Sequence, residues 1–297
     1  MSAADGVRSG ETNDPQATRA AVRQPITGEV RNVADLIPHP DMVKHSKGYT
    51  TQELSILSER GEASFADPIT ITHENVIVEG YALWQLAKLQ RRASLTCIVR
   101  HMDHETALLY LLDKNRSSQG IGDFARILMA LELEPWFREC AKSNQRIGGR
   151  EKGSTHLTEA DRLDVRSEVA RAAGVSAGNV SKVKQIQQFA IPQIREALLA
   201  REIQINRAAT WSRSTPSTQE RRLSDYRSER GIRRTITVLL RKHEDRHPML
   251  REGLRDVQRG LRSLHGDPHL SSVFPSLRAV IDEIGEFLEP VEVSRAA

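Results

Sequence analysis

The stretch Arg166–Gln185, with the sequence RSEVARAAGVSAGNVSKVKQ, decides the architecture of this chain. Its apolar residues recur at helical spacing before and after Gly174, at positions Val169, Ala170, Ala173, Val180 and Val183, and Ile186, directly after the stretch, continues the series. Small residues among them let two helices cross closely at a sharp angle. Gly174 can adopt the positive φ that ends a helix, and the Ser176 hydroxyl is placed to cap the next one. The sequence therefore predicts a helix-turn-helix over 166–185.

The outward face of the second helix is polar, which favours DNA binding through the major groove. The candidate DNA-contacting residues on it are Ser176, Ala177, Gly178, Asn179, Ser181, Lys182 and Lys184. We expect Asn179, Ser181 and Lys182 to reach base edges or the groove, and Lys184 to contact phosphate. The alternative is an ordinary helical hairpin. Gly178 is unfavourable in a helix by up to ~1 kcal/mol relative to Ala, which either close approach to DNA or tolerance near a helix end would explain.

Positive charge gathers around this predicted motif. The whole chain of 297 residues has 43 Lys plus Arg and 39 Asp plus Glu, a net charge of +4. Residues 31–138 hold 12 basic and 14 acidic side chains, whereas residues 141–213 hold 13 basic and 7 acidic ones. Ala141 to Thr158 is predicted to be a flexible basic loop whose Arg146, Arg150 and Lys152 lie along phosphates, or alternatively a solvated linker.

Composition argues against several other classes of protein. Only 4% of residues are aromatic and 28% are charged, which is typical of a modular helical protein rather than a large single-core enzyme. The two cysteines, Cys97 and Cys140, are far apart and lack metal-type CxxC spacing. No apolar run reaches the ~20 residues of a membrane span, and the N-terminus does not resemble a signal peptide. We therefore expect a cytoplasmic protein with no membrane partner and no metal site.

Four regions are predicted along the chain. Residues 1–30 lack large apolar side chains and periodicity, and are expected to form a disordered tail. Residues 31–118 alternate short strands and helices, including a hairpin around His73-Glu74. Residues 119–213 form a helical domain that contains the helix-turn-helix. Residues 214–297 carry further apolar stripes at helical spacing, which predict a helical region that either self-associates or forms an internal core.

The order of these parts resembles the ParB family of DNA-partition proteins. The resemblance covers about residues 31–230 and rests on short segments that occur in family order: Leu36-Ile-Pro-His-Pro, Pro68-Ile-Thr-Ile, Ile77-Val-Glu-Gly, Leu111-Leu-Asp-Lys-Asn115 and then the helix-turn-helix. It implies an α+β fold, with a ParB/sulfiredoxin-like N-terminal domain followed by an all-α helix-turn-helix domain and a helical C-terminal region. It also implies double-stranded DNA as a partner, a homodimer, a partition ATPase as a further partner, and a bacterial, nucleoid- or plasmid-associated location.

The chain departs from the family at its nucleotide box. Where the family has Gly-Glu-Arg-Arg, this chain has Gly80-Tyr-Ala-Leu, and Ser118 stands where the second box has Arg. Gly80, Asn115 and Arg116 remain as a degenerate nucleotide site, in which Arg116 or Arg126 could substitute from a shifted position. Losing two arginines removes charge-assisted phosphate contacts, so we expect neither a bound cofactor nor enzymatic activity. Binding of CTP with Mg²⁺ and CTP hydrolysis by a DNA clamp is the alternative.

Two enzymatic hypotheses fit the residues less well. Sulfiredoxin chemistry needs a reactive cysteine beside the glycine turn, but Tyr81 follows Gly80 and Cys97 lies within an expected strand. A metal-dependent nuclease would need convergent ligands, and the group of His101, Asp103, His104 and Glu105 is explained equally well by a polar loop. The preferred function is a sequence-specific DNA-binding protein acting in plasmid or chromosome partition, or in regulation of a mobile element. A protein-interaction adaptor without DNA reading is a further alternative.

Overall fold

The computed structural model describes residues 28–116, 121–150, 164–242, 248–263 and 270–288. The chain divides into two compact units, residues 1–210 and 211–297. Within the residues described, no helix is both long and apolar enough to span a membrane.

The first unit begins with a mixed five-stranded sheet, in the order β1-β5-β3-β4-β2. The strands are β1 (Gly28–Asn32), β2 (Ile37–Pro38), β3 (Ile69–Thr72), β4 (Val76–Glu79) and β5 (Ser94–Arg100). β1 pairs antiparallel with β5 and β3 pairs antiparallel with β4, whereas β3–β5 and β4–β2 are parallel pairs. The predicted hairpin corresponds to β3 and β4, and together with the helices that follow it gives the predicted α+β fold class.

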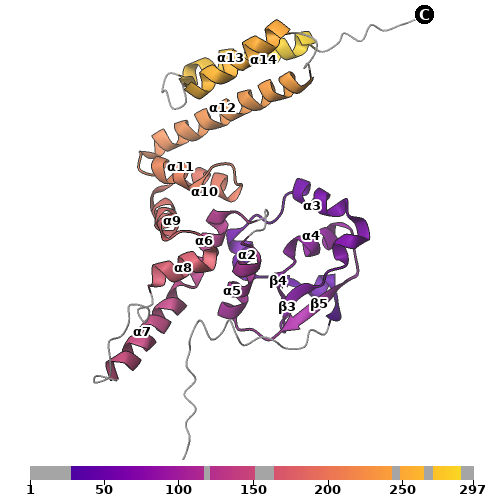
Figure 1. Ribbon diagram of the computed structural model, residues 1–297, viewed down its shortest axis with the longest axis vertical. Coiled ribbons are helices and arrows are strands. Elements are labelled where there is room, and N and C mark those ends of the chain that lie inside the picture. Colours follow the sequence, from indigo (N-terminus) through magenta and orange to yellow (C-terminus); the bar gives the residue numbers. More distant parts are fainter. Residues whose placement is uncertain (1–27, 117–120, 151–163, 243–247, 264–269, 289–297) are drawn as a thin grey trace, which may run out of the picture. The chain divides into compact units, whose positions relative to one another are not determined.

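Short helices surround this sheet. They are the 3₁₀ helices η1 (Val33–Asp35) and η2 (Gly61–Phe65), and the α-helices α2 (Pro40–His45), α3 (Thr51–Ser58), α4 (Tyr81–Leu89) and α5 (His104–Lys114). α3 and α4 pack together beside the sheet (Figure 1), and α5 packs against β4. α3 begins with a capping box, in which the Thr50 hydroxyl accepts from the Glu53 amide and the Glu53 carboxylate accepts from the Thr50 amide.

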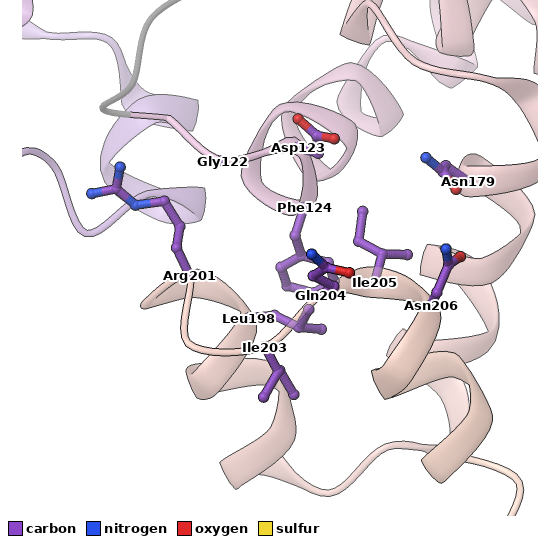
Figure 2. A pocket seen from close by; sticks show the side chains of 10 residues that line it. All are labelled: Gly122, Asp123, Phe124, Asn179, Leu198, Arg201, Ile203, Gln204, Ile205 and Asn206. Atoms are coloured by element: carbon purple, nitrogen blue, oxygen red, sulfur yellow. The ribbon is translucent and has the colours of Figure 1, made fainter. Parts of the chain in front are cut away.

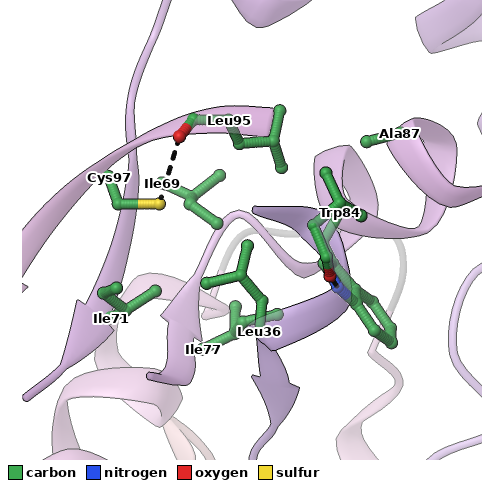
Figure 3. Close-up of a cluster of buried hydrophobic side chains, with 9 residues drawn as sticks. Leu36, Ile69, Ile71, Ile77, Trp84, Ala87, Leu95 and Cys97 are labelled. Atoms are coloured by element: carbon green, nitrogen blue, oxygen red, sulfur yellow. Dashed lines mark hydrogen bonds between the residues drawn. The ribbon is translucent and has the colours of Figure 1, made fainter. Parts of the chain in front are cut away.

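An aliphatic core with one large aromatic residue lies between sheet and helices (Figure 3). Its buried members are Val33, Leu36, Ile69, Ile71, Ile77, Trp84, Ala87, Leu95 and Cys97. The Trp84 indole donates to the Val33 carbonyl at 3.3 Å, so its polar atom is satisfied inside the core. Burial raises the pKa of the Cys97 thiol to about 11, and Cys97 therefore acts as a small apolar residue, not as a nucleophile.

The helical part of the first unit is built on α6 (Asp123–Glu132), which packs against α2, α5, α7, α8, α9 and α10. Seven of its ten residues, Phe124 to Ala130, are buried. The remaining helices are α7 (Glu134–Arg150), α8 (Val165–Ala173), α9 (Ala177–Phe189), α10 (Pro192–Leu199) and α11 (Ile205–Trp211). α6 thus joins the sheet region to the predicted helix-turn-helix.

The second unit consists of α12 (Pro216–Lys242), α13 (Pro248–Ser263) and α14 (Leu270–Leu288), which lie side by side in Figure 1. They share a core of Ile232, Ile236, Leu239, Leu254, Leu261, Phe274 and Ile281. The predicted apolar stripe in α14 is only partly inward, because Val273 and Val280 are exposed while Phe274 and Ile281 are buried.

The structure corrects one predicted boundary and one predicted loop. β1 begins at Gly28, three residues inside the expected disordered tail, because its backbone pairs with β5 even though its side chains are mostly exposed. The segment after Ala141 is not a loop as far as the structure describes it, since α7 continues to Arg150. Lys142, Gln145, Arg146 and Ile147 have adequate helix propensity. Gly148 and Gly149 come only at the end of the helix, where glycine is least unfavourable.

Candidate nucleic-acid interface

α8, α9 and the turn between them form the predicted site's framework. Asp164 caps α8, its carboxylate accepting from the Arg166 amide at 3.1 Å and from the Ser167 hydroxyl at 2.6 Å. The helix ends at Gly174, which has φ +67°. The Val175 amide donates to the Ala170 carbonyl and the Gly174 amide to the Arg171 carbonyl, a Schellman arrangement that needs a left-handed residue at Gly174.

The two helices bury the face that the sequence predicts. Val169, Ala170, Ala173, Val180, Val183 and Ile186 are all buried. Ser176 lies at the N-cap of α9, but its hydroxyl does not accept a capping hydrogen bond, contrary to expectation. The Ser176 carbonyl instead accepts from the amides of Asn179 and Val180, at 3.0 and 3.4 Å, as the first turn of a helix requires.

The polar face of α9 is accessible. Ser176, Gly178, Ser181 and Lys184 are exposed, while Ala177, Asn179 and Lys182 are half-buried. The Ser181 hydroxyl donates to the Ala177 carbonyl at 3.3 Å, and the Lys182 ammonium donates to the Asn206 side chain on α11 at 2.6 Å. These bonds lie at the surface and can be exchanged for contacts with a ligand.

A hollow of about 320 Å³ opens beside this face (Figure 2). Its lining comes from the start of α6, from Asn179 on α9 and from the segment between α10 and α11. Asn179 and Asn206 lie on the same side of it, with Gln204 between α10 and α11. Side-chain amides both donate and accept hydrogen bonds, so the hollow suits a polar, uncharged group such as a base edge better than a phosphate.

Arg201, the cationic side chain that lines the hollow, is already paired with a carboxylate. Arg201 donates from both terminal nitrogens to the Glu53 carboxylate, at 2.7 and 2.8 Å. These bonds outweigh burial of the carboxyl and, with the bonds from Thr50, lower the pKa of Glu53 to about 2. The pair joins α3 of the sheet region to the end of α10.

Lys184 is tied to α7. Its ammonium lies 2.9 and 2.8 Å from the two carboxylate oxygens of Glu134, which also accepts from Arg138 at 2.7 Å. Burial opposes ionisation of Glu134, but the Lys184 and Arg138 contacts prevail and its pKa is lowered. A phosphate contact by Lys184 therefore requires exchange of this ion pair.

The other predicted phosphate contacts are placed only in part. Arg146 and Arg150 belong to α7 rather than to a loop. Lys152 and the rest of the predicted loop up to Thr158 lie outside the described residues. The basic segment is thus a helical extension up to Arg150.

At the degenerate nucleotide box, Gly80 is required by the backbone conformation and by close packing against Ile69. It has φ +89°, and a Cβ there would lie 2.4 Å from Ile69 Cγ2. The neighbouring Glu79 carboxylate accepts from Thr70 and Tyr110 at 2.9 and 2.8 Å and lies 3.2 Å from the Lys114 ammonium. The Lys114 ammonium at this turn is thus paired with Glu79, and a triphosphate would have to compete for it.

Asn115 and the two nearby arginines hold helix ends together. The Asn115 side-chain amide donates to the Leu111 carbonyl at 2.7 Å, and Arg116 donates to the Arg171 carbonyl of α8 at 3.0 Å. Arg126 is buried and donates to the carbonyls of Asn115 and Arg116 and to Asp123. Ser118 lies outside the described residues. The described contacts give these side chains structural roles, which the sequence analysis missed for Arg126.

The histidines weighed for nuclease chemistry separate in the structure. His101 stacks on His73 with ring centroids 5.2 Å apart, and the Asp103 carboxylate caps α5 by accepting from the Thr106 amide. His104 instead faces Asp41 and His39. Burial lowers the pKa of His39 to about 4, despite the opposing effect of the Asp41 carboxylate.

No protein-family model and no curated protein matches this sequence. Among similar solved structures, the C-terminally truncated chromosome-partitioning protein ParB from Caulobacter crescentus, complexed to the centromeric parS site, is 15% identical, with a TM-score of 0.37 over 63% of this chain and 86% of that one. The same protein complexed with CTP-gamma-S is 15% identical, with a TM-score of 0.28 over 64% and 93%. The pNOB8-like ParB N-domain is 13% identical, with a TM-score of 0.41 over 89% and 97%. All three are ParB structures. They come from the family that the sequence motifs resemble.

Proposed function

We propose that this chain is a sequence-specific DNA-binding protein of ParB type, acting in plasmid or chromosome partition or in regulation of a mobile element. The observation that carries the proposal is the construction of α9, whose Val180, Val183 and Ile186 are buried while its polar side is accessible. A helix held in this way by a preceding helix and a left-handed glycine suits insertion into a major groove.

Each element of the interface has a distinct part in the proposal. Asn179, Ser181 and Lys182 approach base edges, and the amides lining the hollow extend this polar surface. Lys184 and the basic end of α7 contact phosphates, which position the protein without specifying sequence. We further propose that the chain acts as a homodimer on two half-sites, with a partition ATPase as partner, on the nucleoid or a plasmid in the bacterial cytoplasm.

We propose that DNA binding does not depend on nucleotide. The Glu79 carboxylate at the Gly80 turn and the engagement of Arg116 and Arg126 with backbone carbonyls support this view. The alternative, a CTP-switched clamp, needs arginines that turn toward a triphosphate at this turn.

The experiment is fluorescence anisotropy with a labelled duplex from the DNA upstream of the coding sequence, against a random duplex of equal length. We expect preference for the upstream duplex, affinity that falls steeply with salt, and no change on adding CTP with Mg²⁺. A CTP-dependent change would replace the proposal by the clamp. Equal affinity for both duplexes, affinity that does not change with salt, or no binding would each contradict sequence-specific DNA binding. The protein-interaction adaptor would then be the remaining hypothesis.

A further inference from the structure

Two histidines and an aspartate meet away from the proposed DNA interface, at the starts of α2 and α5. His39 is the N-cap residue of α2, Asp41 lies in its first turn, and His104 is the first residue of α5. Their ligand-type atoms all lie within 4.8 Å of one another. Two imidazole nitrogens and one carboxylate are a donor set that Zn²⁺ prefers.

The two separations that involve Asp41 fit a single ion. Asp41 Oδ2 lies 3.2 Å from His104 Nε2 and 3.7 Å from His39 Nδ1. Ligand atoms bound tetrahedrally to Zn²⁺ at about 2.0–2.1 Å are about 3.4 Å apart, between these two values. The bond from the Asp41 amide to His39 Nδ1 is long, 3.3 Å, and an ion would take over this lone pair.

Burial supplies a second, independent argument. The Asp41 side chain is only 10% exposed, yet its Oδ2 atom accepts no hydrogen bond. His104 Nε2 lies 3.2 Å away but does not make a well-aligned hydrogen bond to this oxygen, and a bound cation would satisfy it better. The His39 side chain is 1% exposed and lies on the buried side of the cluster. The His104 side chain is 54% exposed, so an ion can reach the cluster from solvent.

We propose that His39, Asp41 and His104 bind one divalent transition-metal ion of the Zn²⁺ class, with solvent completing its coordination. Asp41 also lies within 4.8 Å of the ligand-type atoms of His45 and Glu132, but Glu132 already pairs with His45 and Lys44 at 2.7 Å each. The Lys44 ammonium would repel a second cation there, so Glu132 and His45 border the site without ligating. Bound metal joins α2 to α5. This proposal does not depend on DNA binding.

The test is isothermal titration of Zn²⁺ into the full-length protein after chelator treatment and dialysis, with Co²⁺ absorption as a probe of coordination. His104→Gln removes the exposed ligand without opening the core, and His101→Gln is the matched control, an exposed histidine three residues away. We expect one ion per chain for wild type and His101→Gln, and at least tenfold weaker binding for His104→Gln. We also expect Zn²⁺ to raise the melting temperature of wild type and His101→Gln but not of His104→Gln.

Asp41→Asn provides a second variant, since it keeps the side-chain shape but removes the charge. We expect it to lose the visible Co²⁺ spectrum of a tetrahedral site while its far-ultraviolet circular dichroism stays that of wild type. Equal Zn²⁺ affinity in wild type and His104→Gln, absence of binding in wild type, or equal loss in His101→Gln would each overturn the proposal.

Discussion

At the residue scale, two glycines with opposite surroundings illustrate how backbone geometry determines what a position tolerates. Gly80 has a left-handed backbone, and a Cβ there would meet the Ile69 side chain at 2.4 Å. Gly178 lies in the first turn of α9, and the nearest atom to a Cβ there is Ser176 Oγ at 3.9 Å. The first glycine is required by the fold, and the second is free to change as far as the protein alone is concerned.

Gly80→Ala is therefore expected to lower the free energy of unfolding by about 2–4 kcal/mol, through strain at positive φ and overpacking against Ile69. Gly178→Ala is the matched control and is expected to raise it by up to about 1 kcal/mol. Urea denaturation followed by circular dichroism measures both. A neutral Gly80→Ala would contradict the contact with Ile69, and weaker DNA binding by a more stable Gly178→Ala would show that DNA approaches this turn closely.

Glu53 connects two parts of the first unit through its charge. Its pKa in the folded protein is about 2, below the ordinary value of 4.5, because Arg201 and Thr50 bind the carboxylate. A depressed pKa contributes stability that is present above the unfolded pKa and is lost as pH falls through the folded one. The stabilisation is thus complete at pH 7 and disappears between about pH 4.5 and pH 2.

Glu53→Gln keeps a side chain that can complete the capping box but removes the charge. We expect it to lower the free energy of unfolding at pH 7 by about 1–3 kcal/mol, in keeping with charge-assisted hydrogen bonds, and the deficit to shrink as pH falls toward 2. Glu59→Gln, an exposed residue just past the same helix, is the control and should have little effect. A deficit for Glu53→Gln that does not change with pH would contradict the assignment to the ion pair.

At the scale of elements, local sequence patterns predicted those segments whose apolar spacing matches their buried face. The β3–β4 hairpin and the α8–α9 pair lie close to where their patterns placed them. β1 escaped prediction because Val30, its one large apolar side chain, is 71% exposed and the strand is held by pairing with β5. A strand held by backbone pairing with a distant strand needs no alternation of apolar and polar side chains, so its sequence carries no recognisable pattern.

In the second unit, a glycine lies inside a helix instead of at its end. Gly231 is a residue at which a helix commonly ends, but α12 runs through it to Lys242. Buried Ile232 and Ile236 follow Gly231 at once, and their packing outweighs the unfavourable helix propensity of glycine. α13, which was not predicted, alternates charged residues with the widely spaced Leu254 and Leu261 that enter the core.

The candidate site was predicted unevenly for similar reasons. The exposed face of α9 follows from helical spacing alone. The Asn179–Asn206 side of the hollow and the meeting of His39 and Asp41 with His104 join residues distant in sequence, so no spacing rule could find them. The pairing of Lys184 with Glu134 likewise depends on how α7 and α9 pack.

At the scale of the whole molecule, each of the two units has a core formed by its own residues. Ile236 is completely buried among α12, α13 and α14, so Ile236→Ala should destabilise this bundle by about 2–4 kcal/mol. Hydrogen exchange should show faster exchange in these helices and unchanged protection in α8 and α9. Val238→Ala, on the exposed side of the same helix, is the control. Loss of protection in α8 and α9 on Ile236→Ala would contradict separate cores.

The central claim is that the polar face of α9 binds DNA, and one comparison tests it directly. The salt dependence of binding to the upstream duplex is measured for wild type, Lys182→Gln, Lys184→Gln and Lys88→Gln, the last being an exposed lysine on α4 of the sheet region. We predict weaker binding for both α9 variants, a logarithmic salt slope reduced by about 1 for a lost phosphate contact, and no change for Lys88→Gln. Wild-type affinity and slope in both α9 variants would contradict the placement of DNA on α9.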